Sequence, residues 1–119
     1  MKKILFIEDD FLTNKAYRDK FSKEYEVSVA INGIDGVNTA VRTKPNLIVL
    51  DIMLGGDMNG FDVLRELKLR PESAGIPVIM LTNLEAQEES AKAAGAVELV
   101  VKANTSLEII AEKIKKYAK

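Results

Sequence analysis

The sequence predicts an α/β protein with a doubly wound sheet of five parallel strands and five helices. Five short apolar runs recur along the chain, and helical patterns lie between them. Several of the runs are apolar at nearly every position, as in parallel strands that are buried on both faces. Strands that alternate with helices form a parallel sheet whose right-handed crossovers cover both sides. A chain of 119 residues suits one domain, which we expect over residues 1–119.

The apolar runs differ in pattern, and the pattern predicts their surroundings. The first, third and fourth runs are nearly continuous, which predicts burial on both faces. The second alternates apolar with small or polar residues, which favours an edge position. The expected strands are 3–7, 27–31, 46–50, 77–81 and 97–101.

Between the strands the apolar residues recur at helical spacing. Pro45 and Pro71 end the second and third helical patterns, Gly95 ends the fourth, and "TSLE" from Thr105 to Glu108 is a capping-box pattern. The expected helices are 11–24, 34–43, 60–70, 84–94 and one that starts at Thr105. The residues expected on one face of each are Leu12, Ala16 and Phe21, then Ile34, Val37 and Val41, then Phe61, Leu64 and Leu67, and finally Leu107, Ile110 and Ile114.

Composition excludes several classes of function. The net charge of -1 argues against a nucleic-acid binder, which would have a basic excess. The chain has no Cys and no His, so thiolate or imidazole ligands for a metal are absent. A metal site must therefore use oxygen ligands, which favours Mg²⁺, Mn²⁺ or Ca²⁺. The apolar run after "MKK" is too short for a signal peptide, so we expect a cytoplasmic protein.

Polar residues follow the expected strands where each one ends. Parallel strands place their carboxyl ends at one edge of the sheet, where ligands of doubly wound sheets bind. Asp10 alone is explained as a helix cap, and a lone Thr or Lys would mean little, but the joint pattern is specific. The residues are Glu8, Asp9 and Asp10 after the first strand, Asp51 after the third, Thr82 after the fourth and Lys102 after the fifth.

These side chains suit phosphoryl transfer to a carboxylate. Oxygens of Glu8, Asp9 and Asp51 could hold Mg²⁺, and Lys102 could pair with Asp51. A carboxylate nucleophile needs no separate base, and a cation, an ammonium and a hydroxyl such as Thr82 stabilise a transferring phosphoryl group.

With these residues, the entire chain resembles a receiver domain of a two-component response regulator, of the single-domain chemotaxis-regulator type. The resemblance implies a flavodoxin-like sheet of order 2-1-3-4-5 and phosphorylation of Asp51 by a sensor kinase phosphohistidine with Mg²⁺. Glu8 and Asp9 match the acid pair, with Asp9 favoured as the direct ligand, and the Met53 backbone carbonyl matches a further metal ligand. Thr82 matches the switch hydroxyl and Lys102 the phosphoryl-contacting lysine.

The resemblance also implies partners and a role. Such domains are not enzymes acting on a separate substrate, because they catalyse only their own phosphorylation and slow dephosphorylation. We expect a sensor histidine kinase or phosphotransfer protein as donor and a downstream protein as target, with no direct DNA binding and no membrane contact. The target surface would extend from the fourth strand to the fifth helix and include Leu99.

The chain departs from the family pattern at several positions. The loop "LGGDMNG" at 54–60 lacks the usual Pro and is one residue longer, and Ala103 replaces the Pro that follows the lysine. Leu99 stands where the family has a switch aromatic. Met53 and Leu84 are apolar where a polar side chain often orients water, which predicts a long-lived phosphorylated state.

Two other functions remain as alternatives. A pseudo-receiver would use the same fold for protein contacts without phosphorylation, and Leu99 favours it mildly. A Mg²⁺ phosphatase with an Asp nucleophile would need a D-x-D-x-T motif, which "EDDFLT" does not match. A flavodoxin phosphate loop, a P-loop and an EF-hand loop fit the sequence poorly.

Overall fold

The computed structural model describes residues 1–82, 91–92, 94–102 and 105–119. These residues form a sheet of five parallel strands in the order β2-β1-β3-β4-β5, which confirms the predicted sheet. Each strand lies within one residue of its predicted range. The strands are β1 (Lys3–Ile7), β2 (Glu26–Ala30), β3 (Leu47–Asp51), β4 (Val78–Thr82) and β5 (Glu98–Val101).

The described residues form four helices, so the prediction of five helices is wrong for this part of the chain. The helix predicted at 84–94 falls mostly on residues that lie outside the described ones. That prediction depended on the Ala and Glu content of the segment, and helix propensity is a weak signal without a strong apolar face. The four helices are α1 (Phe11–Phe21), α2 (Gly33–Thr43), α3 (Gly60–Leu69) and α5 (Leu107–Tyr117).

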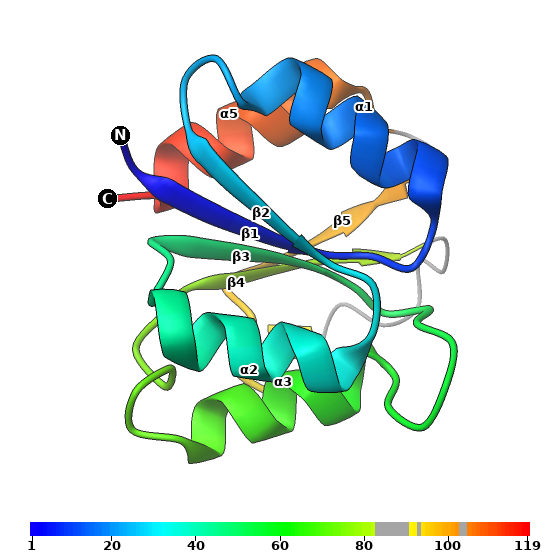
Figure 1. Ribbon diagram of the computed structural model, residues 1–119, viewed down its shortest axis with the longest axis vertical. Coiled ribbons are helices and arrows are strands. Elements are labelled where there is room, and N and C mark those ends of the chain that lie inside the picture. Colours follow the sequence, from blue (N-terminus) through cyan, green and yellow to red (C-terminus); the bar gives the residue numbers. More distant parts are fainter. Residues whose placement is uncertain (83–90, 93, 103–104) are drawn as a thin grey trace.

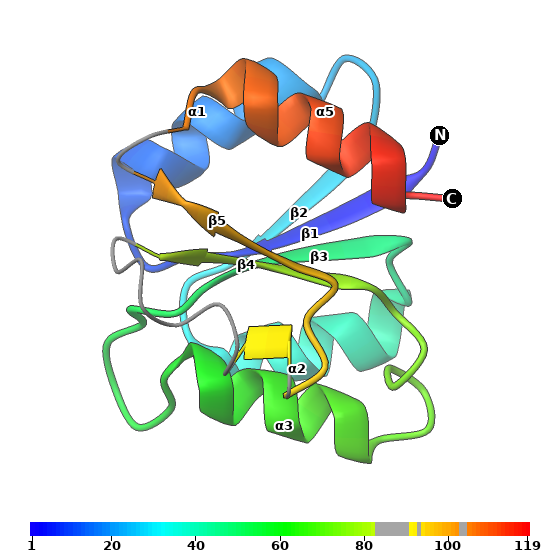
Figure 2. The same ribbon diagram turned by 180° about the vertical axis from the view of Figure 1, so that it is seen from behind.

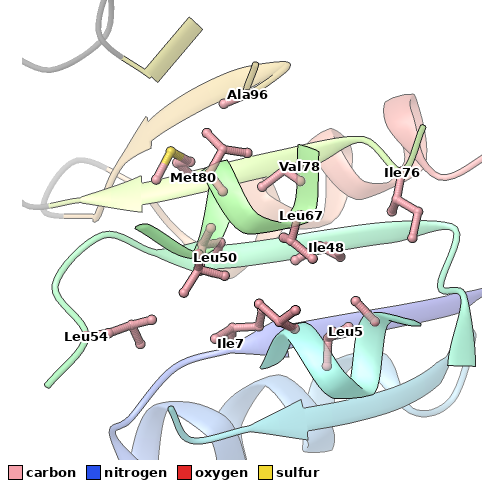
Figure 3. Packing of buried hydrophobic residues seen from close by; sticks show 14 of the residues in the cluster. Leu5, Ile7, Ile48, Leu50, Leu54, Leu67, Ile76, Val78, Met80 and Ala96 are labelled. Carbon is pink, nitrogen blue, oxygen red and sulfur yellow. The ribbon is translucent and has the colours of Figure 1, made fainter. Parts of the chain in front are cut away.

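The sheet separates two apolar clusters, because side chains alternate between the faces of each strand. Figures 1 and 2 show α1 and α5 over one face and α2 and α3 over the other. On β1, Leu5 and Ile7 join the cluster under α2 and α3, part of which Figure 3 shows. Ile4 and Phe6 join the cluster under α1 and α5, where Phe6 stacks on Tyr17 with ring centroids 4.5 Å apart.

The predicted apolar faces are right for α3 and α5 and partly wrong for the first two helices. Leu64, Leu67, Ile110 and Ile114 are buried as expected. Leu12 and Ile34, however, are 71% and 57% exposed. In α1 the buried residues are Asn14, Tyr17 and Phe21, which are also at helical spacing.

Helix starts agree with the capping chemistry in the sequence, with one shift. Asp10 caps α1 by accepting a hydrogen bond from the Thr13 amide at 2.8 Å, as expected. The cap of α5 is Ser106, not Thr105, because its hydroxyl accepts from the Ile109 amide at 3.3 Å. None of the helices described combines the length and the apolar character that crossing a bilayer requires.

Candidate phosphorylation and metal site

Asp51 lies at the centre of the carboxyl edge of the sheet, as the last residue of β3. β3 lies between β1 and β4, so Asp51 faces the ends of both neighbouring strands. Its side chain is 6% exposed. The Met53 amide donates to Asp51 Oδ1 at 3.0 Å, and Lys102 Nζ donates to Oδ2 at 3.0 Å. The carboxylate is therefore held in one orientation by a backbone amide and an ammonium.

Glu8 follows β1 and is more deeply buried than its position after a strand suggests. Only 3% of the residue is exposed. Lys102 Nζ donates to Glu8 Oε1 at 2.7 Å, and the Asp10 amide donates to Oε2 at 3.2 Å. The Asn14 side chain donates to the Glu8 carbonyl at 2.7 Å, so it fixes the backbone at this point.

Burial raises the pKa of Glu8 to about 7, although the hydrogen bond from Lys102 acts in the opposite direction. The neighbouring Asp51 carboxylate adds to the increase. Burial lowers the pKa of Lys102, but hydrogen bonds to Glu8 and Asp51 outweigh it and hold that pKa above its usual value. Among the described residues, the Lys102 ammonium alone forms ion pairs with the buried carboxylates of Glu8 and Asp51, so two acids share one positive charge.

Asp9 completes the acidic group from the exposed side. Glu8, Asp9 and Asp51 each offer an oxygen, and these oxygens lie within 4.8 Å of one another. Asp9 Oδ2 accepts a hydrogen bond from the Gly55 amide at 3.1 Å. Three carboxylates around a partly open point suit a hard divalent cation with bound waters. Because Glu8 and Asp51 are buried, a bound cation would stabilise these carboxylates more than it would stabilise an exposed acidic cluster.

The loop between β3 and α3 approaches Asp51 closely at Gly60. A Cβ at position 60 would lie 2.6 Å from the Asp51 carbonyl oxygen and 2.5 Å from Ile52 Cα. The Gly60 amide donates to the Ile52 carbonyl at 2.9 Å. Only glycine permits this contact, and Asn59 before it caps the start of α3.

Of the other predicted residues, Thr82 lies at the same edge of the sheet, whereas Leu99 lies two residues before the end of β5. Thr82 ends β4 and is fully buried, one residue beyond the partner of Asp51 in the β3–β4 register. Leu99 pairs with Met80 and packs against the cluster under α2 and α3. The Met53 side chain is 59% exposed. Leu84 and the Lys102–Ala103 peptide bond lie outside the described residues.

Two groups at the site were missed by sequence reasoning. Asn14 was one of several polar residues in a predicted amphipathic helix, and only its place four residues after capping Asp10 hinted at contact with the strand end. The Gly55 amide leaves no side-chain signal at all. In the described chain, Asn14 Oδ1 is the one buried side-chain oxygen without a hydrogen-bond partner.

Comparison with known proteins shows the family to which the chain belongs. The family model described as response regulator receiver domain matches residues 4–114. The probable transcriptional regulatory protein SilR of Salmonella typhimurium is 38% identical over 113 residues, covering 92% of this chain and 48% of SilR. The chain thus spans about half the length of the curated relatives that it matches over most of its own length.

Solved structures agree in fold. The CheY-like response regulator receiver domain protein of Methanospirillum hungatei has a TM-score of 0.84 at 31% identity, with 98% of this chain and 92% of that chain covered. The receiver domain of the sensor histidine kinase PA1611 of Pseudomonas aeruginosa has a TM-score of 0.86 at 22% identity, covering 98% and 97%. That structure holds a magnesium ion in its active-site cleft.

Proposed function

The chain belongs to the receiver domains of two-component response regulators, and we propose that Asp51 is its phosphoacceptor. The observation that carries the proposal is the convergence of Glu8, Asp9 and Lys102 on the Asp51 carboxylate at one edge of the sheet. The donor would be a phosphohistidine of a sensor kinase or of a phosphotransfer protein. Phosphorylation would switch a protein-interaction surface.

The proposed transfer needs one bond to form and one to break. An Asp51 carboxylate oxygen attacks phosphorus, and the bond from phosphorus to the histidine nitrogen breaks. The electron pair of that bond stays on the imidazole, which leaves as the neutral ring after it takes up a proton from solvent. Asp51 needs no base for this step, in agreement with a chain that has no His or Cys.

Glu8, Asp9, Asp51 and the Met53 backbone carbonyl would hold Mg²⁺. Two observations support the fit. The three carboxylates lie close together, and the buried Glu8 carboxylate shares the ammonium of Lys102 with Asp51. The ion supplies positive charge that offsets repulsion between the carboxylates and the incoming phosphoryl oxygens. The receiver domain of PA1611 gives further support, because it holds magnesium in the corresponding fold.

Lys102 and Thr82 have separate proposed roles. Lys102 pairs with Asp51 before the reaction and is placed to contact a phosphoryl oxygen afterwards, since its ammonium already lies 3.0 Å from Asp51 Oδ2. Thr82, at the end of the adjacent strand, would donate its hydroxyl to another phosphoryl oxygen. Leu99 would take part in the resulting switch through its contact with the core under α2 and α3.

We propose that residues 1–119 form one receiver domain located in the cytoplasm. Its activity would be limited to its own phosphorylation and slow dephosphorylation, and the surface from β4 to α5 would contact the target. Since relatives such as SilR are about twice as long, the target and the output of the whole protein are part of this proposal.

The proposal is tested by intact mass after incubation with acetyl phosphate, with and without Mg²⁺. We expect the parent to gain one phosphoryl group only with Mg²⁺, and Asp51→Asn to gain none. Asp57→Asn, an exposed acid in the following loop, is the matched control and should react like the parent. Folded protein that gains no phosphoryl group with saturating Mg²⁺ would contradict the proposal and favour the pseudo-receiver alternative.

A further inference from the structure

The loop between β3 and α3 is attached to the acidic site by a hydrogen bond that a bound cation would disturb. The Gly55 amide donates to Asp9 Oδ2 at 3.1 Å. Asp9 is also one of the three carboxylates that could hold a divalent cation. One side chain therefore serves both the position of the loop and the metal site.

Residues 55–58 lie between two anchored points of the chain, and Met58 at their end packs against the core cluster under α2 and α3. Before this segment, Leu54 is 8% exposed and belongs to the core cluster under α2 and α3. After it, Asn59 caps α3 in a capping box with Asp62. Between them Gly56 has φ of +88°, a conformation natural to glycine. Among the hydrogen bonds described for residues 55–58, only the one from Gly55 ties this segment to the acidic site.

The cation would pull Asp9 away from its present geometry. Mg²⁺ demands near-octahedral coordination at about 2.1 Å, which puts adjacent ligand oxygens about 3 Å apart. The oxygens of Glu8, Asp9 and Asp51 lie within 4.8 Å of one another, and Mg²⁺ binding would bring the oxygens that it uses to the separations of this shell. The positive end of the Gly55 amide dipole would also be repelled by a dication at the same carboxylate.

We propose that the Asp9–Gly55 hydrogen bond depends on the metal. It holds residues 55–58 against Asp9 in the metal-free protein, and it breaks when Asp9 coordinates Mg²⁺. The proposal rests on the metal site of the proposed function. The coupling is reciprocal. If Mg²⁺ binding weakens the hydrogen bond from the Gly55 amide to Asp9, that hydrogen bond weakens Mg²⁺ binding by the same factor. Gly55 is thus a positioning residue that acts through Asp9.

Residues 55–58 also line a pocket next to the start of α2. Residues 55–58 form one wall of a pocket of about 330 Å³, and residues 32–35 at the start of α2 form the other. Met58 lies against Gly33 so closely that a Cβ there would be 2.8 Å from Met58 Cβ. Movement of the segment would therefore change the surroundings of Met58 and the shape of this pocket.

Two substitutions at position 55 isolate the hydrogen bond. Gly55→Pro removes the donor, whereas Gly55→Ala keeps it. Both add a Cβ, which at this position would lie 3.3 Å from Asp9 Oδ2, so Ala is the matched control for crowding. A hydrogen bond to a charged, partly exposed acceptor accounts for about three- to tenfold in an equilibrium.

Methyl NMR of the four methionines follows the loop directly during Mg²⁺ titration. Met58 reports on the segment, and fully buried Met80 reports on correct folding. In the parent and in Gly55→Ala, we expect Mg²⁺ to shift the Met58 signal. In Gly55→Pro without metal, that signal should already lie toward its metal-bound position, and Mg²⁺ should bind about three- to tenfold more tightly than in Gly55→Ala.

The proposal is overturned if Mg²⁺ binds the parent while the Met58 signal stays in place, or if the Ala and Pro variants bind Mg²⁺ equally. If Met80 shows that Gly55→Pro is misfolded, the Gly55 amide signal of the parent decides, since it must lose its hydrogen-bonded proton shift on Mg²⁺ binding. Phosphorylation by acetyl phosphate on the same samples separates the two proposals. A phosphorylated parent with an unresponsive loop contradicts only this inference, whereas absent Mg²⁺ binding contradicts both.

Discussion

Replacing Glu8 by Gln should remove one source of the pH dependence of the free energy of unfolding. Burial raises the pKa of Glu8 to about 7 from its usual value of 4.5. The folded parent therefore binds a proton that the unfolded chain releases, so the parent loses stability as pH rises from 4.5 to about 7. Gln cannot titrate and does not show this loss.

The size of the effect follows from the two pKa values. Their difference corresponds to about 3 kcal/mol of unfolding free energy. Because Glu8 is only 3% exposed, solvent screening reduces this figure little. The unfolding free energy of Glu8→Gln minus that of the parent should be about 3 kcal/mol larger at pH 8 than at pH 4.

Urea unfolding with a chelator at both pH values measures this difference through circular dichroism. Glu112→Gln, at an exposed glutamate of α5, is the control and should follow the pH dependence of the parent. A difference between Glu8→Gln and the parent that stays constant from pH 4 to pH 8 would refute the reasoning. It would mean that the Glu8 carboxylate is not destabilised by burial in the folded protein.

Three further substitutions test the packing and capping around the site by urea unfolding. Gly60→Ala should cost about 1–3 kcal/mol, because its Cβ would meet the Asp51 carbonyl, and an unchanged midpoint would contradict this. Ser106→Ala should cost about 1 kcal/mol by removing the α5 cap, and no loss would contradict the assignment of the cap to Ser106. Leu64→Ala should cost about 2–5 kcal/mol at a fully buried position, and a loss below this range would indicate that the core collapses around the cavity.

The strands and the acidic site could be predicted because their signals are local. A buried parallel strand is apolar at nearly every position, and the first polar residue marks its carboxyl end. Strand ends in a parallel sheet must meet at one edge, so the sequence alone places Glu8, Asp51 and Lys102 together. Their contacts at 2.7 Å and 3.0 Å follow from that placement.

Other features have no such signal. Spacing alone did not distinguish a face through Leu12 from one through Tyr17, because α1 carries polar Asn14 on its buried face. The neighbouring hydroxyls of Thr105 and Ser106 made the cap of α5 ambiguous by one residue. The bond from Gly55 to Asp9 uses a backbone amide, which any residue except proline supplies, so it depends on the path of the loop and not on a motif.

The most direct test of the account locates the phosphoryl group itself. Borohydride reduction of protein treated with acetyl phosphate and Mg²⁺ converts an aspartyl phosphate to homoserine, which peptide mass spectrometry can place in the sequence. The account predicts homoserine at position 51 and at no other acid. Homoserine at position 9 or 57, with Asp51 unchanged, would contradict the central claim that Asp51 is the phosphoacceptor held by Lys102 beside the metal site.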